Sequence, residues 1–150
     1  MPHNTEVLVG DANGEHVLVR LLRRAHPQAH DYWDGNWIAC EVSVRAGAFR
    51  ATFTADLRAE EFQRFLGEVR LLQTSLEGVA RFETMEEQLT LSLTRSIKGR
   101  VQVAGVARDV AGTGNELRFE FDIDQTYLPA LSGGLERGLA NFPVVGSPDA

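Results

Sequence analysis

Alternation of apolar and polar residues dominates the chain and predicts β-strands. In residues 37–46, Ile38, Cys40, Val42 and Val44 share one face, and mostly polar side chains take the other. The same alternation recurs along the chain and leaves each strand with one polar face, which is typical of antiparallel sheets covered on one side. The predicted strands are residues 5–9, 16–22, 37–46, 49–55, 79–83, 88–95, 100–108 and 116–123.

Two segments instead repeat their apolar residues every three or four positions, as the buried stripe of a helix does. Leu57 and Phe62 fit a hydrophobic staple at the start of the first helix, predicted over residues 58–75. Asp56 and Arg58 compete for its N-cap position. The stripes are Phe62, Phe65, Leu66, Val69, Leu72 and Leu76 in this helix, and Leu128, Leu131, Leu135, Leu139 and Phe142 in a second helix over residues 129–141.

Taken in order, the predicted elements read ββββα-ββββα. This order predicts an α+β fold, a twisted antiparallel sheet of about seven to eight strands with both helices on its apolar face. Gly105 interrupts its strand where the phase of alternation shifts, which predicts a β-bulge. We expect residues 1–143 to form a single domain and residues 144–150 to form a flexible C-terminal tail.

The charge balance narrows the classes of partner. The 150 residues include 15 Lys and Arg against 21 Asp and Glu, so the formal net charge is −6. An acidic balance disfavours non-specific binding to nucleic acid or to an anionic membrane. No apolar run reaches the ~18 residues of a transmembrane helix, and residues 1–7 lack the pattern of a secretory signal. The sequence therefore predicts a cytoplasmic protein without a membrane partner.

Common enzyme signatures are missing from the sequence, including a phosphate loop, a dinucleotide fingerprint, a nucleophile elbow and a His-Glu-x-x-His pair. The single cysteine, Cys40, lies among apolar strand residues and is expected to be buried, with no base implied beside it. Residues of metal-ligating type in one loop are His26, His30, Asp31 and Asp34. No helix fixes their spacing, so we expect no metal site in this loop. Because the enzyme signatures are also missing, we expect no cofactor and no catalytic residue.

Residues 23–36 show no periodicity and are predicted to form a long loop, a length typical of functional or mobile segments. Both tryptophans and one of the two tyrosines lie within residues 32–37, and aromatic side chains on a loop commonly anchor a partner protein. The predicted partner-binding residues are Asp31, Tyr32, Trp33 and Asp34. The alternative is structural, with Trp37 closing the end of the sheet and residues 34–36 forming a tight turn.

Acidic residues follow one face of the last predicted strand. Positions two apart on a strand lie ~7 Å apart on the same face, and carboxylates at such a spacing can carry acid–base chemistry. Cross-strand ion pairs with arginines such as Arg45 and Arg50 on a solvated face also explain them. The candidate residues of this open face are Glu120, Asp122, Asp124 and Arg118.

Two stretches carry a family resemblance, residues 31–37 (DYWDGNW) at the start of a strand and residues 124–128 (DQTYL) before the last helix. With the order of elements between them, residues 16–143 resemble a group of small bacterial proteins that includes the WapI-type immunity proteins. The resemblance implies a protein that neutralises a toxin delivered between bacteria by binding it. It implies no catalytic residues.

We therefore predict a non-catalytic bacterial protein-binding module of the immunity type, with a toxin as its protein partner. Two alternatives stay open, a small-ligand-binding domain and a single-stranded nucleic-acid binder, because a doubled ββββα order also occurs in the latter class. The predicted open face has few aromatic residues, so nucleic acid is the less favoured partner. A homodimer through an unpaired sheet edge is compatible with the sequence.

Overall fold

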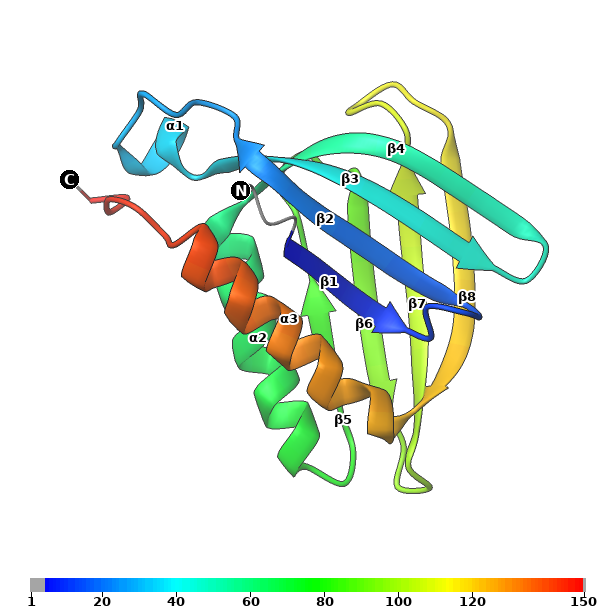
Figure 1. The fold of residues 1–150 in the computed structure, drawn as a ribbon. Helices are drawn as coiled ribbons and strands as arrows, with labels where there is room; N and C mark the ends of the chain where they lie inside the picture. Colours follow the sequence, from blue (N-terminus) through cyan, green and yellow to red (C-terminus); the bar gives the residue numbers. More distant parts are fainter. Residues whose placement is uncertain (1–4, 150) are drawn as a thin grey trace.

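A computed structural model describes residues 5–149, and within them eight strands form two four-stranded antiparallel sheets (Figure 1). The first sheet contains β1 (Thr5–Gly10), β2 (His16–Arg24), β3 (Trp37–Ala46) and β4 (Phe49–Arg58). The second contains β5 (Gly78–Phe82), β6 (Leu89–Arg95), β7 (Arg100–Arg108) and β8 (Glu116–Asp124). The helices are α1 (Tyr32–Gly35), α2 (Ala59–Thr74), the short 3₁₀ helix η1 (Gln125–Tyr127) and α3 (Leu128–Asn141). The predicted α+β class and the ββββα-ββββα order of the main elements are confirmed.

The single sheet that the pattern suggested is divided in two, because β4 and β5 do not pair. Instead, buried residues of both sheets join one hydrophobic core, so that the two apolar faces cover each other. In β3, the residues predicted to share the buried face are each exposed by 2% or less, namely Ile38, Cys40, Val42 and Val44. The alternation of apolar and polar residues indicates that one face of a strand is buried, but it does not indicate which element covers that face.

The two long helices lie side by side along one side of the molecule (Figure 1). α3 packs against β1 and α2 packs against β5, so the helices also cover the outer strands of the two sheets. The predicted stripe of α2 is buried from Phe62 to Leu72, whereas Leu76 is 70% exposed. The inclusion of Leu76 was wrong because the helix already ends at Thr74.

The predicted bulge at Gly105 is also wrong. Gly105 pairs in regular register with Leu91 on one side and Phe119 on the other. A Cβ atom at this position would lie 2.4 Å from Cζ of Phe119, so the glycine makes room for that ring. The register instead shifts between Leu21 and Arg23 of β2.

The start of α2 settles the choice between Asp56 and Arg58 in favour of Arg58 as the N-cap residue. Its own side chain does not cap the helix. Instead, the main-chain N–H of Arg58 donates to Oε1 of Glu61 at 2.8 Å, one half of a capping box. The second oxygen of Glu61 accepts from the main-chain N–H of Met85 at 2.6 Å, which ties α2 to the loop after β5.

Candidate protein-binding site at α1

One turn of helix, α1, lies within the segment predicted to be a long loop. Its N-cap is Asp31, whose carboxylate accepts from the main-chain N–H of Asp34 at 3.2 Å. The loop is also shorter than predicted, because β2 continues through Arg23 to Arg24. Aspartate suits an N-cap because its side-chain oxygen satisfies a free N–H of the first turn, a short-range signal within the sequence DYWDG.

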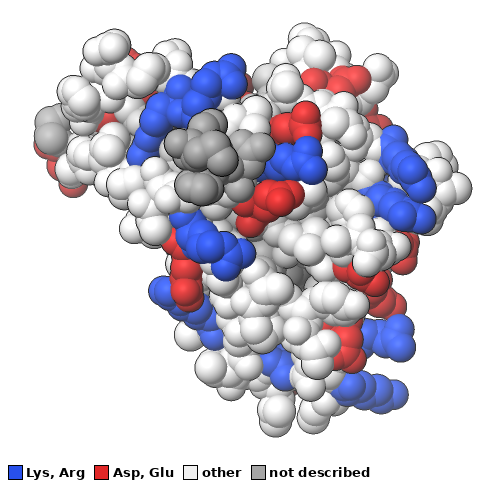
Figure 2. Space-filling view, in the orientation of Figure 1, with Lys and Arg blue, Asp and Glu red and all other residues white. Residues whose placement is uncertain are grey.

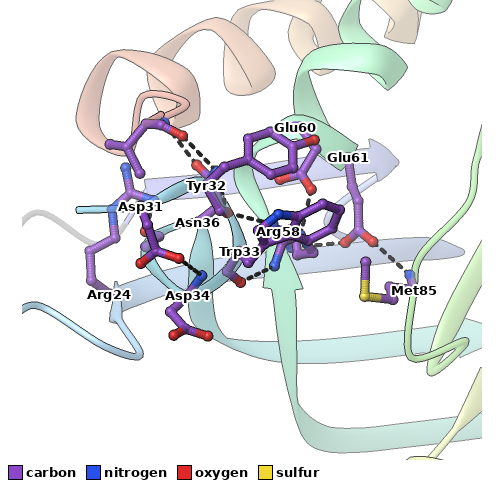
Figure 3. Close-up of polar contacts among 12 residues, drawn as sticks. Arg24, Asp31, Tyr32, Trp33, Asp34, Asn36, Arg58, Glu60, Glu61 and Met85 are labelled. Atoms are coloured by element: carbon purple, nitrogen blue, oxygen red, sulfur yellow. Dashed lines mark hydrogen bonds and ion pairs between the residues drawn. The ribbon is translucent and has the colours of Figure 1, made fainter. Parts of the chain in front are cut away.

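Arg58 is the residue around which this segment is built (Figure 3). Its side chain is 1% exposed, and three aromatic rings contact its guanidinium carbon. The centroids of Trp37, Tyr32 and Trp33 lie 4.8, 5.3 and 5.8 Å from that atom. The three contacts are cation–π interactions, which strengthen when water is excluded.

Hydrogen bonds satisfy the buried guanidinium. Its two terminal nitrogens donate to the main-chain carbonyls of Trp33 and Tyr32, each at 2.7 Å, and Nε donates to the carboxylate of Glu60. Arg58 lies directly across from Trp37 in the β3–β4 register, on the outer face of the sheet. It is buried there because residues 31–37 fold over it.

A second set of contacts holds the segment from the C-terminal side. Asn36 is fully buried, and its Nδ2 donates at 2.9 Å to the carbonyls of both Tyr32 and Val145. Its Oδ1 accepts from the N–H of Val145 at 2.9 Å. Arg24 donates to the carbonyls of Gly35 and Pro143. Residues 31–37, which we call the α1 segment, are thus fixed to β4 on one side and to residues 143–145 on the other.

The predicted partner-binding residues lie together on this anchored turn. Trp33 is 54% exposed, Asp31 and Asp34 are exposed, and Tyr32 is half-buried. The rings of Tyr32 and Trp33 meet edge to face with centroids 5.0 Å apart. Burial, reinforced by the charge of Glu60, raises the pKa of Tyr32.

Sequence reasoning missed the residues that hold this site, namely Arg58, Glu60 and Asn36. The available signal was an arginine in an N-cap position, where its side chain cannot cap a helix. Trp37 is half-buried against Arg58, a contact in keeping with the structural alternative for that residue.

The second candidate surface, the open face of β8, consists of separate local contacts. Asp122 pairs at 3.6 Å with Arg100 of the neighbouring strand β7, and Glu120 accepts from Gln102 of the same strand at 3.4 Å. Asp124 is the N-cap of η1 and accepts from the N–H of Thr126. Hydrogen bonds from Thr126 lower the pKa of Asp124. Ion pairing, hydrogen bonding and helix capping therefore account for these acidic residues, and no acid–base chemistry is needed to explain them.

Arg118 donates to Glu116 at 3.1 Å and is not paired with the acidic line. The expected partners Arg45 and Arg50 lie in the other sheet, because the strands do not form the single sheet that would have aligned them. A hydrogen bond from Arg108 lowers the pKa of Glu116. Ion pairing on this face thus stays within the second sheet.

Cys40 is 1% exposed, and burial raises the pKa of its thiol well above its ordinary value. A thiol held in this state is a poor nucleophile. Within residues 5–149, no three histidine, cysteine, aspartate or glutamate side chains gather closely enough to hold a metal ion. Across that same range, none of the helices combines the length and the apolar character that crossing a membrane requires.

Comparison with known proteins places the chain in a family. No curated protein matches the chain. A family model described as the immunity protein WapI-like family matches residues 8–143. This range includes the whole α1 segment and both sheets, except for the first residues of β1. The chain therefore belongs to the WapI-like immunity protein family.

Proposed function

We propose that this protein is a non-catalytic immunity protein that neutralises a toxin by binding it through the α1 segment. Membership of an immunity family supports the general role. The observation that carries the choice of surface is Trp33, a tryptophan that is 54% exposed on a turn whose main chain is held by a buried arginine. We expect the protein to act in the cytoplasm of the cell that makes it.

A fixed, exposed tryptophan suits protein recognition for two physical reasons. Tryptophan is enriched among the few residues that dominate binding energy at interfaces. A side chain already held in its bound position loses less conformational entropy when the complex forms. Arg58 and Asn36 supply that rigidity, because both donate hydrogen bonds to the carbonyl of Tyr32, directly before Trp33.

The charge of the protein favours a basic partner. A formal net charge of −6 accelerates encounter with a positively charged protein such as a nuclease. Over the face drawn in Figure 2, acidic and basic side chains are interspersed. We therefore expect steering by net charge, with specificity supplied by the aromatic turn.

Binding of the toxin domain encoded beside this protein tests the proposal. Isothermal titration measures the affinity, and growth of cells that express the toxin measures neutralisation. We expect Trp33→Ala to weaken binding by more than about tenfold. Phe49→Ala is the matched control, because Phe49 is 65% exposed on the β3–β4 hairpin, away from α1 (Figure 1).

Loss of affinity in Trp33→Ala, with normal affinity in Phe49→Ala, would support α1 as the binding surface. Equal effects of the two substitutions would overturn it. Failure of the wild-type protein to bind or neutralise the toxin would overturn the proposed function itself.

A further inference from the structure

Two hollows meet on the outer face of the first sheet, beside the α1 segment. They enclose about 480 and 380 Å³ and share Asp56, Gln88 and Ala111 among the residues that line them. Their floor includes Ala39 and Thr54, which point outward from β3 and β4. Their walls come from the loops that follow β2, β5 and β7. We call these joined hollows the outer-face groove.

The smaller hollow combines an aromatic wall with unpaired acidic groups. Trp37 lines it together with Asp56 and Glu86, and His26 lies at its border with the α1 segment. Neither Asp56 nor Glu86 has an ion-pair partner or a hydrogen-bond donor among residues 5–149. Other acidic residues of the sheets, such as Glu41, are paired with arginines. No lysine or arginine of the described chain lines this smaller hollow, whereas Arg23 lines the larger one.

Gln88 adds an independent feature, because its side-chain amide is held in place and its oxygen is an unused acceptor. It is only 6% exposed and lines both hollows. Its Nε2 donates to the carbonyls of Thr54, Arg108 and Asp109 at 3.2, 3.1 and 3.4 Å. These bonds fix the amide, and its Oε1 accepts no hydrogen bond from any residue in 5–149. This oxygen can accept a hydrogen bond from water or from the N–H group of a bound partner.

We propose that the outer-face groove binds an arginine side chain of the toxin, an inference that rests on the proposed function. A guanidinium stacks on an indole ring and presents several N–H donors in one plane. Trp37, whose ring also contacts Arg58, supplies the aromatic wall. Asp56 and Glu86 supply the carboxylates, and Gln88 supplies the neutral acceptor. The groove adjoins the α1 segment through His26, which also lines a hollow formed with Asp34. One partner can therefore contact the groove and Trp33 together.

The first test needs no toxin. The probe is N-acetyl-arginine amide, added to ¹⁵N-labelled protein and followed by NMR. We expect saturable shifts of the Trp37 indole N–H and the Gln88 side-chain amide, and weaker shifts with N-acetyl-lysine amide. The variant carrying Asp56→Asn and Glu86→Gln should lose them. The control variant carries Glu120→Gln and Asp122→Asn on β8, which change the net charge by the same amount. It should keep the shifts of Trp37 and Gln88.

The second test uses the toxin and the same two variants. Loss of affinity by at least about tenfold in the groove variant alone supports the proposal. Normal toxin binding by the groove variant overturns it while leaving the proposed function intact. The wild-type protein could show saturable shifts with the arginine probe and yet fail to bind the toxin. That result would overturn the proposed function, and the bound arginine would then not come from the toxin. Absence of saturable shifts in the wild-type protein overturns the groove as an arginine site.

Discussion

The guanidinium of Arg58 lies 4.8 Å from the ring of Trp37, its direct neighbour across the β3–β4 pair. The contact joins the last residue of β4 to the first residue of β3. The same guanidinium binds the carbonyls of Tyr32 and Trp33. One buried side chain thus connects the sheet, the start of α2 and the exposed aromatic turn.

Replacement of Arg58 by lysine should loosen the turn although the charge is kept. Lysine cannot present the planar fork that reaches both carbonyls, and a lost hydrogen bond to a charged group costs about 1.5–3 kcal/mol. We expect a decrease of about 2–3 kcal/mol in the free energy of unfolding, measured by urea denaturation, and a red shift of tryptophan emission.

An exposed ion pair provides the control for this substitution. Arg70 and Glu136 pair at 3.1 Å, with side chains 57% and 54% exposed. Arg70→Ala should change stability by no more than about 0.5 kcal/mol. Equal losses from the two substitutions would contradict the anchoring role of Arg58.

Gly105 is predicted to resist even the smallest side chain. A Cβ atom there would lie 2.4 Å from Phe119 and 2.9 Å from Leu91, and overpacking of a core costs about 1–3 kcal/mol. Gly105→Ala should therefore destabilise the protein by that amount in thermal or urea unfolding. Adding Phe119→Leu should recover part of the loss.

Gly67 is the control for Gly105. Gly67 lies in the interior of α2, and no atom lies within 4 Å of a Cβ atom placed on it. Gly67→Ala should raise stability by about 0.5–1 kcal/mol. If both alanine substitutions shifted stability in the same direction, steric contact with Phe119 would not be the cause.

Glu61 should make stability depend on pH. Burial raises its pKa above the ordinary 4.5, although N–H groups of Arg58 and Met85 oppose the rise. The folded protein therefore holds the proton more tightly than the unfolded chain, and this contribution to stability is lost as pH rises from 4.5 through the raised pKa.

Glu61→Gln removes this titration but places an amide NH₂ against one of the two N–H donors, at a cost of about 1–3 kcal/mol. The wild-type protein should be the more stable at acidic pH, and the difference should narrow as pH rises. Urea unfolding across the pH range measures it. A difference that stayed constant would show that Glu61 has the same pKa in both states.

Asn36 is predicted to control the order of residues 143–145. Asn36→Ala removes its three hydrogen bonds, two of them to Val145, with an expected loss of about 1–3 kcal/mol. Hydrogen exchange should show faster exchange of the Val145 amide. Asn13→Ala, at an exposed turn position, should leave that rate unchanged. Unaltered exchange in Asn36→Ala would mean that other contacts hold this segment.

The elements could be predicted from the sequence because their patterns are local. Alternation in residues 37–46 and the three-four spacing from Phe62 to Leu72 follow from burial of one face of a strand or helix. The aromatic turn could be singled out as well, since its tryptophans and tyrosine are close in sequence. Its role as the partner-binding site stays a prediction.

By itself, the sequence determined the α+β class, the order of the main elements and the buried face of β3. Only the tertiary structure decided that the strands divide into two sheets, that residues 31–37 cover Arg58, and that Asp56, Glu86 and Gln88 meet in one groove. The reason is physical. Local patterns show that a face is covered, but the covering partner depends on how distant segments dock, and no short-range periodicity encodes that docking.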